Sequence, residues 1–245
     1  MSKFLEKIRK VTRLQSQPLG FGAGRAADEP TMLLAARTGD PGAVADLARR
    51  GADAVIVDLS KSSGPPSKPA AADGLVVGAL IGARTEGDAT ACKEAGYDFV
   101  VFDPETAAAT ALLEESVGYV LVLPPALTDS EARTLDGLQL DAIDVGTIGG
   151  AMTVRQQLDL RRVYALTRRP LMAGVSPDVS VTELQTLRDT NVAVVVADSA
   201  AGVERLRKTI DALPQRTRRK DSEDRPTPLV PRALMVEEEE EHDHD

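Results

Sequence analysis

Arginine and aspartate recur at matched places in this chain, close to the ends of apolar runs. Arg37 lies in the motif AARTGD and Arg84 in a second copy of it, GARTEGD. Each copy is followed by another apolar run that ends in an aspartate, Asp58 or Asp103. A guanidinium group binds carboxylate or phosphate through two parallel hydrogen bonds, and a carboxylate moves protons or holds Mg²⁺. These four side chains are therefore candidates for a site that takes a small anionic metabolite.

Each candidate has a role that follows from its chemistry. We expect Arg37 and Arg84 to bind the anion, Asp58 to hold Mg²⁺, and Lys61 or Asp103 to transfer protons. Lys61 would also suit a general base or a Schiff-base amine if burial lowers its pKa. The alternative is structural, with Arg37 paired to Asp58 and Arg84 paired to Asp103 as duplicated ion pairs. Because active sites are usually asymmetric and this pattern is not, the sequence favours the ion pairs.

Eight apolar runs rich in Val, Ile and Leu must position these residues. Continuous apolar character, without alternation, is typical of strands that are buried on both faces of a parallel sheet. Successive runs start at a nearly regular spacing, with one longer gap before the seventh. The runs are residues 31–36, 53–58, 75–81, 98–103, 118–123, 140–146, 170–175 and 192–198.

Helix signals lie in most of the gaps between these runs. The stretch DPGAVADLARRG, residues 40–51, begins with an N-cap aspartate and a proline and ends with a glycine. Thr128 with Glu131, and Ser180 with Glu183, form the capping-box pattern that marks a helix start. Strand and helix thus alternate along the chain.

Eight such alternations over residues 31–213 predict a closed (β/α)8 barrel, or TIM-like barrel, of eight parallel strands. An open, doubly wound sheet is the alternative. The internal repeat favours the barrel, because odd and even strands then behave as two classes, as a layered barrel interior requires. The carboxyl ends of all eight strands share one face of a barrel, so the candidate residues would meet at a common mouth.

Several segments fall outside this alternation. Residues 59–74 contain too much Pro, Gly and Ser for a normal crossover helix, which indicates either an eroded helix or a lid that carries Lys61. Residues 1–15 predict an amphipathic helix that packs under the barrel, contacts another subunit of a homo-oligomer, or binds a membrane surface. Residues 16–30 are expected to be a linker, and residues 214–245 a disordered, charged tail that ends in acidic residues.

The composition limits the partners. A net charge of −9 and an aromatic content of 3% oppose nucleic-acid binding, which relies on positive charge and on base stacking. The one cysteine, Cys92, excludes an internal disulfide and indicates a reducing cytoplasm. No apolar run approaches the roughly 20 residues that a membrane span needs.

The segment RPLMAGVSPDVSVTELQTLRDTNVAVVVADSAAGVERL, which covers the last two predicted strands, resembles phosphate-binding (β/α)8 barrels such as indole-glycerol-phosphate and thiamin-phosphate synthases. In that superfamily the ends of strands 7 and 8 present backbone N–H groups to a phosphate. The resemblance implies a substrate-binding role for Gly174, Ser176 and Ser199. Asp198 departs from the pattern, because a small residue is expected there and a carboxylate would repel phosphate.

Two functions stay open. The symmetric charge pattern, Asp198 and the lack of histidine in the predicted barrel favour a non-catalytic, degenerate barrel with an interaction or scaffold role. The alternative is a lyase- or isomerase-type enzyme that acts on a small anionic, or phosphorylated, metabolite at the mouth. That second function rests on the analogy that most known barrels are enzymes.

Overall fold

The eight apolar runs form a closed ring of parallel strands in the computed structural model. The structure describes residues 2–12, 30–61, 66–70, 74–81, 87–124 and 127–214, so most of the predicted linker and tail lies outside it. Each strand pairs with the next along the chain, and β8 pairs with β1. The closed barrel is thereby confirmed and the open sheet is not. The strands are β1 (Leu33–Thr38), β2 (Ala54–Asp58), β3 (Val76–Ile81), β4 (Phe99–Phe102), β5 (Gly118–Val122), β6 (Ala142–Ile148), β7 (Leu171–Val175) and β8 (Val192–Ala197).

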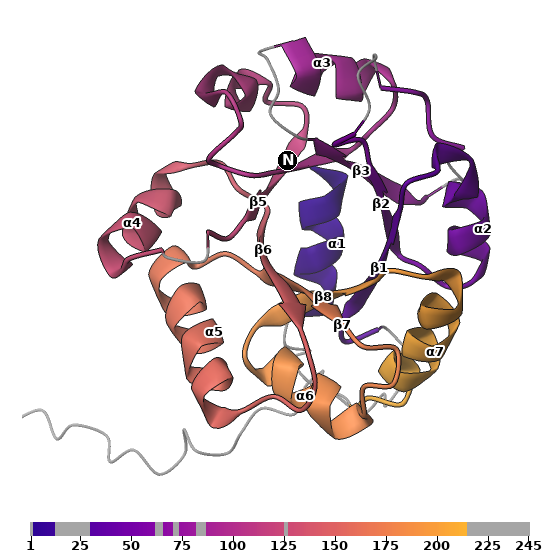
Figure 1. Cartoon of the computed structure of the whole chain (residues 1–245), viewed down its shortest axis with the longest axis vertical. Coiled ribbons are helices and arrows are strands. Elements are labelled where there is room, and N and C mark those ends of the chain that lie inside the picture. The colour runs from indigo at the N-terminus through magenta and orange to yellow at the C-terminus, as the bar shows by residue number, and fades with distance from the viewer. Residues whose placement is uncertain are drawn as a thin grey trace, which may run out of the picture.

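Helices surround the ring of strands on the outside, except α1, which is seen through the ring in Figure 1 and contacts residues at the amino ends of the strands. The capping boxes at Thr128 and Ser180 are present, and Thr153 forms a third. No helix in the described ranges is long and apolar enough to cross a bilayer. The helices are α1 (Lys3–Thr12), α2 (Val44–Arg49), α3 (Gly87–Glu94), α4 (Asp129–Thr134), α5 (Val154–Thr167), α6 (Val181–Asp189) and α7 (Ala200–Asp211), with 3-10 turns η1 (Pro41–Ala43), η2 (Ala109–Leu113) and η3 (Leu135–Gly137).

Helix α1 closes the end of the barrel at which the strands begin. Its apolar stripe, Phe4, Ile8 and Val11, is buried in the same cluster as the inward-facing side chains of the strands. The sequence left two other partners open for this stripe, another subunit or a membrane surface. To bind either one through this stripe, the helix would have to leave this core. In the structure, the amphipathic pattern of α1 is satisfied within one chain.

Lysines on α1 fix its position against residues that precede even-numbered strands. Lys3 Nζ lies 2.8 Å from Asp98 Oδ1, just before β4. Lys7 Nζ donates a hydrogen bond of 2.9 Å to the backbone carbonyl of Asp53, just before β2. The same two aspartates also accept backbone N–H groups from the preceding odd-numbered strands. They therefore join two strands to one another and to the helix.

Aromatic rings fill the part of the lumen near the amino ends of the strands. Phe4 and Phe99 stack with their centroids 4.1 Å apart and their planes 9° apart. Gly78 on β3 makes room for this stack, because a Cβ there would lie 2.3 Å from the Phe99 ring. Aliphatic side chains from the other strands pack around the stack. A polar site inside the barrel can therefore lie only near the mouth.

In the unusual crossover between β2 and β3, residues 66–70 contact segments that flank other strands. The Ser67 carbonyl accepts a 3.0 Å hydrogen bond from the Tyr97 hydroxyl, and the Ala70 N–H donates to the Pro41 carbonyl at 3.2 Å. Pro69 between them is buried. The described residues of this crossover, 59–61, 66–70 and 74, contain no helix, in agreement with the eroded-helix interpretation.

Candidate functional site at the barrel mouth

Arg37 and three aspartates that interact with it lie in the layer of the barrel interior nearest the mouth, beside the apolar Leu80 and Val122. Each of the four charged residues stands two residues beyond an apolar side chain that faces the lumen, and residues two apart on a strand share a face. They are Arg37 on β1, Asp58 on β2, Asp144 on β6 and Asp198 directly after β8. One guanidinium group thus shares this layer with three carboxylates.

Arg37 pairs with two of these carboxylates, and the two pairs differ in strength. Its Nη2 lies 3.3 Å from Asp144 Oδ2, and the Asp144 side chain is only 5% exposed. Its Nη1 lies 3.9 Å from Asp198 Oδ1, and the Asp198 side chain is 62% exposed. Its Nε is buried and has no hydrogen-bond partner among the described residues. A ligand can replace the exposed, long contact far more easily than the buried one.

A bulge in β6 holds Asp144 in place. The register between β6 and β7 shifts between Asp144 and Thr147, and Gly146 within this bulge has a φ of +78°. Such a left-handed conformation is natural for glycine and strained for other residues. The Gly146 N–H donates a 2.9 Å hydrogen bond to Asp144 Oδ1. Bulges are frequent beside active sites, where they redirect a side chain.

The surroundings shift the pKa values of two mouth aspartates in opposite directions. Burial raises the pKa of Asp144, and the negative charge of Asp198 adds to this rise, while the Gly146 N–H and Arg37 act against it. For Asp58, burial also acts upward, but the hydrogen bonds from Ser60 and nearby positive charges give a lowered pKa. Asp144 is thus the mouth carboxylate that is easier to protonate.

Of the other residues predicted for the site, Asp58 lies in the charged layer, and Lys61 and Asp103 lie at the rim. Asp58 Oδ1 accepts hydrogen bonds from the Ser60 N–H at 2.9 Å and from its hydroxyl at 2.6 Å. Lys61 is exposed in the turn after β2, without the burial that would activate its amine. Asp103 is exposed and accepts the Glu105 N–H at 2.9 Å.

Two further expectations concern metal binding and ion pairing. Among the residues that the structure describes, no group of three or more His, Cys, Asp or Glu is placed to hold a metal ion, and the assignment of Mg²⁺ to Asp58 stays a prediction. The predicted pairing of Arg37 with Asp58 is replaced by pairing with Asp144 and Asp198, since both carboxylates come within 4.0 Å. Arg84 lies outside the described residues.

The three residues assigned by resemblance to phosphate binding have contacts within the fold. Ser176 Oγ accepts the Asp178 N–H at 3.3 Å, and Ser199 Oγ accepts the Gly202 N–H at 3.1 Å as the N-cap of α7. A Cβ at Gly174 would lie 2.8 Å from a side-chain oxygen of the β6 bulge. This glycine therefore lets β6 pack closely against β7. The N–H groups of Asp178 and Gly202 are used in hydrogen bonds within the fold.

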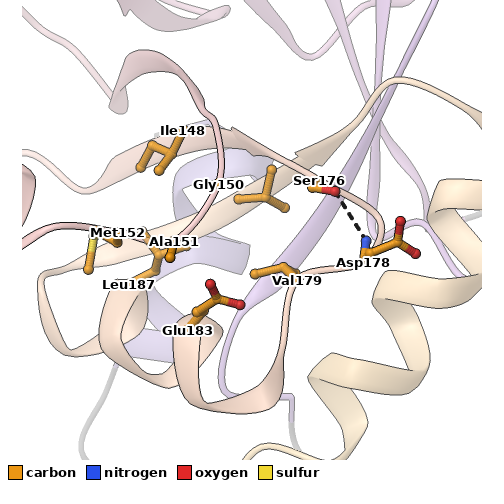
Figure 2. Close-up of a pocket in the computed structure, with 10 residues that line it drawn as sticks. Ile148, Gly150, Ala151, Met152, Ser176, Asp178, Val179, Glu183 and Leu187 are labelled. Atoms are coloured by element: carbon orange, nitrogen blue, oxygen red, sulfur yellow. Dashed lines mark hydrogen bonds between the residues drawn. The ribbon is translucent and has the colours of Figure 1, made fainter.

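A pocket of about 150 Å³ lies at the same end of the barrel but outside the ring of strands, between the loop after β6 and the loop after β7 (Figure 2). Its walls are mostly apolar, and its polar side chains are those of Ser176, Asp178 and Glu183. The lining residues are Ile148, Gly150, Ala151, Met152, Val175, Ser176, Asp178, Val179, Glu183 and Leu187. This end of the barrel thus combines a charged layer with a small cavity.

The sequence analysis assigned no catalytic or binding role to Asp144 or Asp198. The signal that identifies them is alternation within each strand, because both follow an inward-facing residue by two positions. Their contact with Arg37 depends on closure of the ring, which joins residues 107 positions apart for Asp144.

Comparisons with known proteins identify the fold. No family model matches the chain, and no curated protein matches it. Among solved structures, a tryptophan synthase alpha-subunit from Pyrococcus furiosus is 13% identical, with a TM-score of 0.55 over 75% of this chain and 98% of its own. A 3-hexulose-6-phosphate synthase is 19% identical, with a TM-score of 0.54 over 73% and 99%. A phosphoribosyl anthranilate isomerase from Thermus thermophilus is 14% identical, with a TM-score of 0.52 over 73% and 98%. The chain is therefore a (β/α)8 TIM barrel, and at these identities the likeness shows the fold alone.

Proposed function

We propose that the barrel mouth is an active site of the lyase or isomerase type, in which Asp144 transfers a proton on a small anionic metabolite bound by Arg37. The observation that carries this proposal is the burial of Asp144 beside Arg37. A buried ion pair is a poor source of stability, and apolar side chains at the same place would serve a purely structural barrel at least as well. A carboxylate with a raised pKa in such a layer suits an acid or a base.

Arg37 can accept an anionic ligand without losing Asp144. The contact with Asp198 is long and its carboxylate is exposed, so a substrate carboxylate or phosphate would take the place of Asp198 on Nη1. The ligand would then lie over the charged layer, within hydrogen-bond reach of Asp144, as proton transfer requires. The exposed Lys61 and Asp103 contribute charge at the rim in this proposal.

The similar solved structures add support by analogy. Their names describe synthases and an isomerase, and these enzymes share the fold of this chain. Active sites of TIM-barrel enzymes lie at the carboxyl ends of the strands, where Arg37 and Asp144 are found. Shared fold alone does not give shared chemistry, so the proposal depends on the mouth residues.

The test measures hydrogen exchange, because it does not require the reaction to be known. Small carboxylates and phosphate esters are incubated with the protein in D₂O, and their C–H signals are followed by NMR. We expect at least one compound to exchange a C–H hydrogen, and Asp144→Asn to slow this exchange by about 100-fold or more. Asp159→Asn, which removes a carboxylate on the outer face of α5, is the matched control and should keep the native rate.

A second function, the non-catalytic barrel with an interaction or scaffold role, is favoured by the pairing of charges at the mouth. Arg37 already has two acidic partners, and Ser176 and Ser199 use nearby N–H groups. Thermal shifts measured on the same compounds separate the two functions. Binding that Arg37→Ala abolishes, without any exchange, would overturn the enzyme and leave a ligand-binding barrel. If the compounds show no binding and no exchange, both the catalytic and the ligand-binding role of the mouth are overturned, and the scaffold role is left.

A further inference from the structure

The pocket near the mouth has apolar walls and no basic side chain among its lining residues. Its apolar walls come from the end of β6 and the loop after it, and from β7, the loop after it and α6. These residues are Ile148, Met152, Val175, Val179 and Leu187. A dry cavity of about this size holds a molecule as large as benzene, so roughly six heavy atoms fit. The pocket therefore suits a small apolar group.

Glu183 supplies one negative charge to this pocket. Figure 2 shows its carboxylate pointing between Ala151 and Val179, into the space that the lining residues surround. Its Oε2 accepts hydrogen bonds from the Ser180 N–H at 2.9 Å and the Ser180 hydroxyl at 2.7 Å. Its Oε1 accepts no hydrogen bond from the described residues. One oxygen is thus fixed by the helix start, and the other is left for a ligand.

The remaining carboxylate is directed elsewhere. Asp178 points away from the other lining residues in Figure 2, and its Oδ1 lies 2.8 Å from Arg205 on α7. The Asp178 N–H donates to Ser176 Oγ, and the Glu183 N–H donates to Ser180 Oγ at 3.2 Å. These N–H groups are already used, so a phosphate in this pocket would meet the charge of Glu183 with few donors in return.

We infer that this pocket binds a small primary ammonium ion that carries a short apolar chain, with the nitrogen on Glu183 and the chain against Met152, Val175 and Leu187. Burial of the ligand's alkyl chain stabilises the complex in proportion to the apolar area removed from water. The ammonium group adds a charge-assisted hydrogen bond to Glu183. This inference does not depend on a reaction at the mouth, because Arg37 and Asp144 do not line the pocket.

Three probes with the same chain isolate the effect of charge: n-butylammonium, n-butanol and butyrate. Binding is followed by backbone amide shifts of the native, full-length protein. We expect butylammonium to bind most tightly and butyrate least, with shifts in residues 148–152 and 175–187. Glu183→Gln keeps the capping box, since glutamine also serves at this position, but removes the charge. It should weaken butylammonium binding about tenfold and change butanol binding less than about twofold.

The matched control is Glu131→Gln, which makes the same change in the equivalent capping box of α4, far from the lining residues. It should leave all three affinities unchanged, as should Asp144→Asn. Butyrate binding as tightly as butylammonium would overturn the inference. So would equal butylammonium affinity in native protein and Glu183→Gln, or no shift of the lining amides at about 10 mM of any probe.

Discussion

At the scale of the residue, the most informative side chain is Asp144, because its environment opposes its charge. It is almost fully buried, yet it faces a guanidinium group and a backbone N–H. Groups of this kind cluster at functional sites, although structural ion pairs also perturb pKa values. Its titration is therefore a direct probe of the mouth.

The pH dependence of stability should reveal this titration. Burial raises the pKa of Asp144 in the folded state above 3.8, its ordinary value. Between the pKa of Asp144 in the unfolded chain and its higher pKa in the folded chain, the folded chain keeps a proton that the unfolded chain has lost. The free energy of unfolding therefore decreases as the pH rises through this window. Asp144→Asn lacks the effect. We expect its free energy of unfolding in urea denaturation, relative to that of the native chain, to increase as the pH rises from 3.8 through the folded-state pKa of Asp144.

Asp58→Asn is the control with the opposite sign. The pKa of Asp58 is lowered in the folded state, so this carboxylate adds stability that is present above 3.8 and is lost as the pH falls through the folded pKa. Relative to the native chain, this variant should lose stability as the pH rises from about 3 to about 5. Equal trends in the two variants would show that the two carboxylates have the same environment, in conflict with the geometry of the mouth.

At the scale of the element, helix α1 acts as the base of the barrel core. Phe4 is completely buried and stacks on Phe99, whereas Leu5, its neighbour in the sequence, is only partly buried. Phe4→Ala should therefore lower the free energy of unfolding by about 3–5 kcal/mol, the usual cost of an aromatic side chain lost from a core. Leu5→Ala is the control, and chemical denaturation should show a loss of no more than about 1 kcal/mol. Similar losses in both variants would contradict the position of α1.

The sequence predicts these elements well and their partners poorly, for a physical reason. A continuous apolar run identifies a buried strand by itself, and the capping pairs at Thr128 and Ser180 identify helix starts by local hydrogen bonds. The stripe on α1 indicates only that one face is buried. It does not tell whether the burial is in the barrel, in another subunit or in a membrane, because all three environments are apolar.

The same limit applies to the candidate site. The chain shows that Arg37 and several aspartates end up near the mouth, since this needs only strand direction. Which carboxylate meets the guanidinium group depends on stagger around the closed ring and on the β6 bulge. These are long-range properties, so Asp58 was expected beside Arg37 and Asp144 was found there.

At the scale of the whole molecule, the barrel has two sets of aspartates with different tasks. Asp53, Asp98 and Asp141 stand just before even-numbered strands and hold the base, where Asp141 also accepts a hydrogen bond from Ser2. The aspartates at the opposite end surround Arg37. In a barrel, residues at the amino ends of strands usually serve stability and those at the carboxyl ends serve function. The closed base leaves the mouth as the face through which a ligand reaches the charged layer.

Removal of residues 1–12 tests this division of the molecule. The truncation exposes the apolar base and removes Phe4, Ile8 and Val11 from the core. Each buried side chain of this kind contributes about 1.5–3 kcal/mol, so the total is comparable with the stability of a whole domain. We expect the truncated chain to lose cooperative thermal unfolding, followed by circular dichroism. A peptide of residues 2–12 added in trans should restore it, while a peptide of the same composition in scrambled order should not. If the truncated chain instead unfolds at the native temperature and has lost self-association or binding to anionic vesicles, α1 serves as an outward handle and the base of the barrel is stable without it.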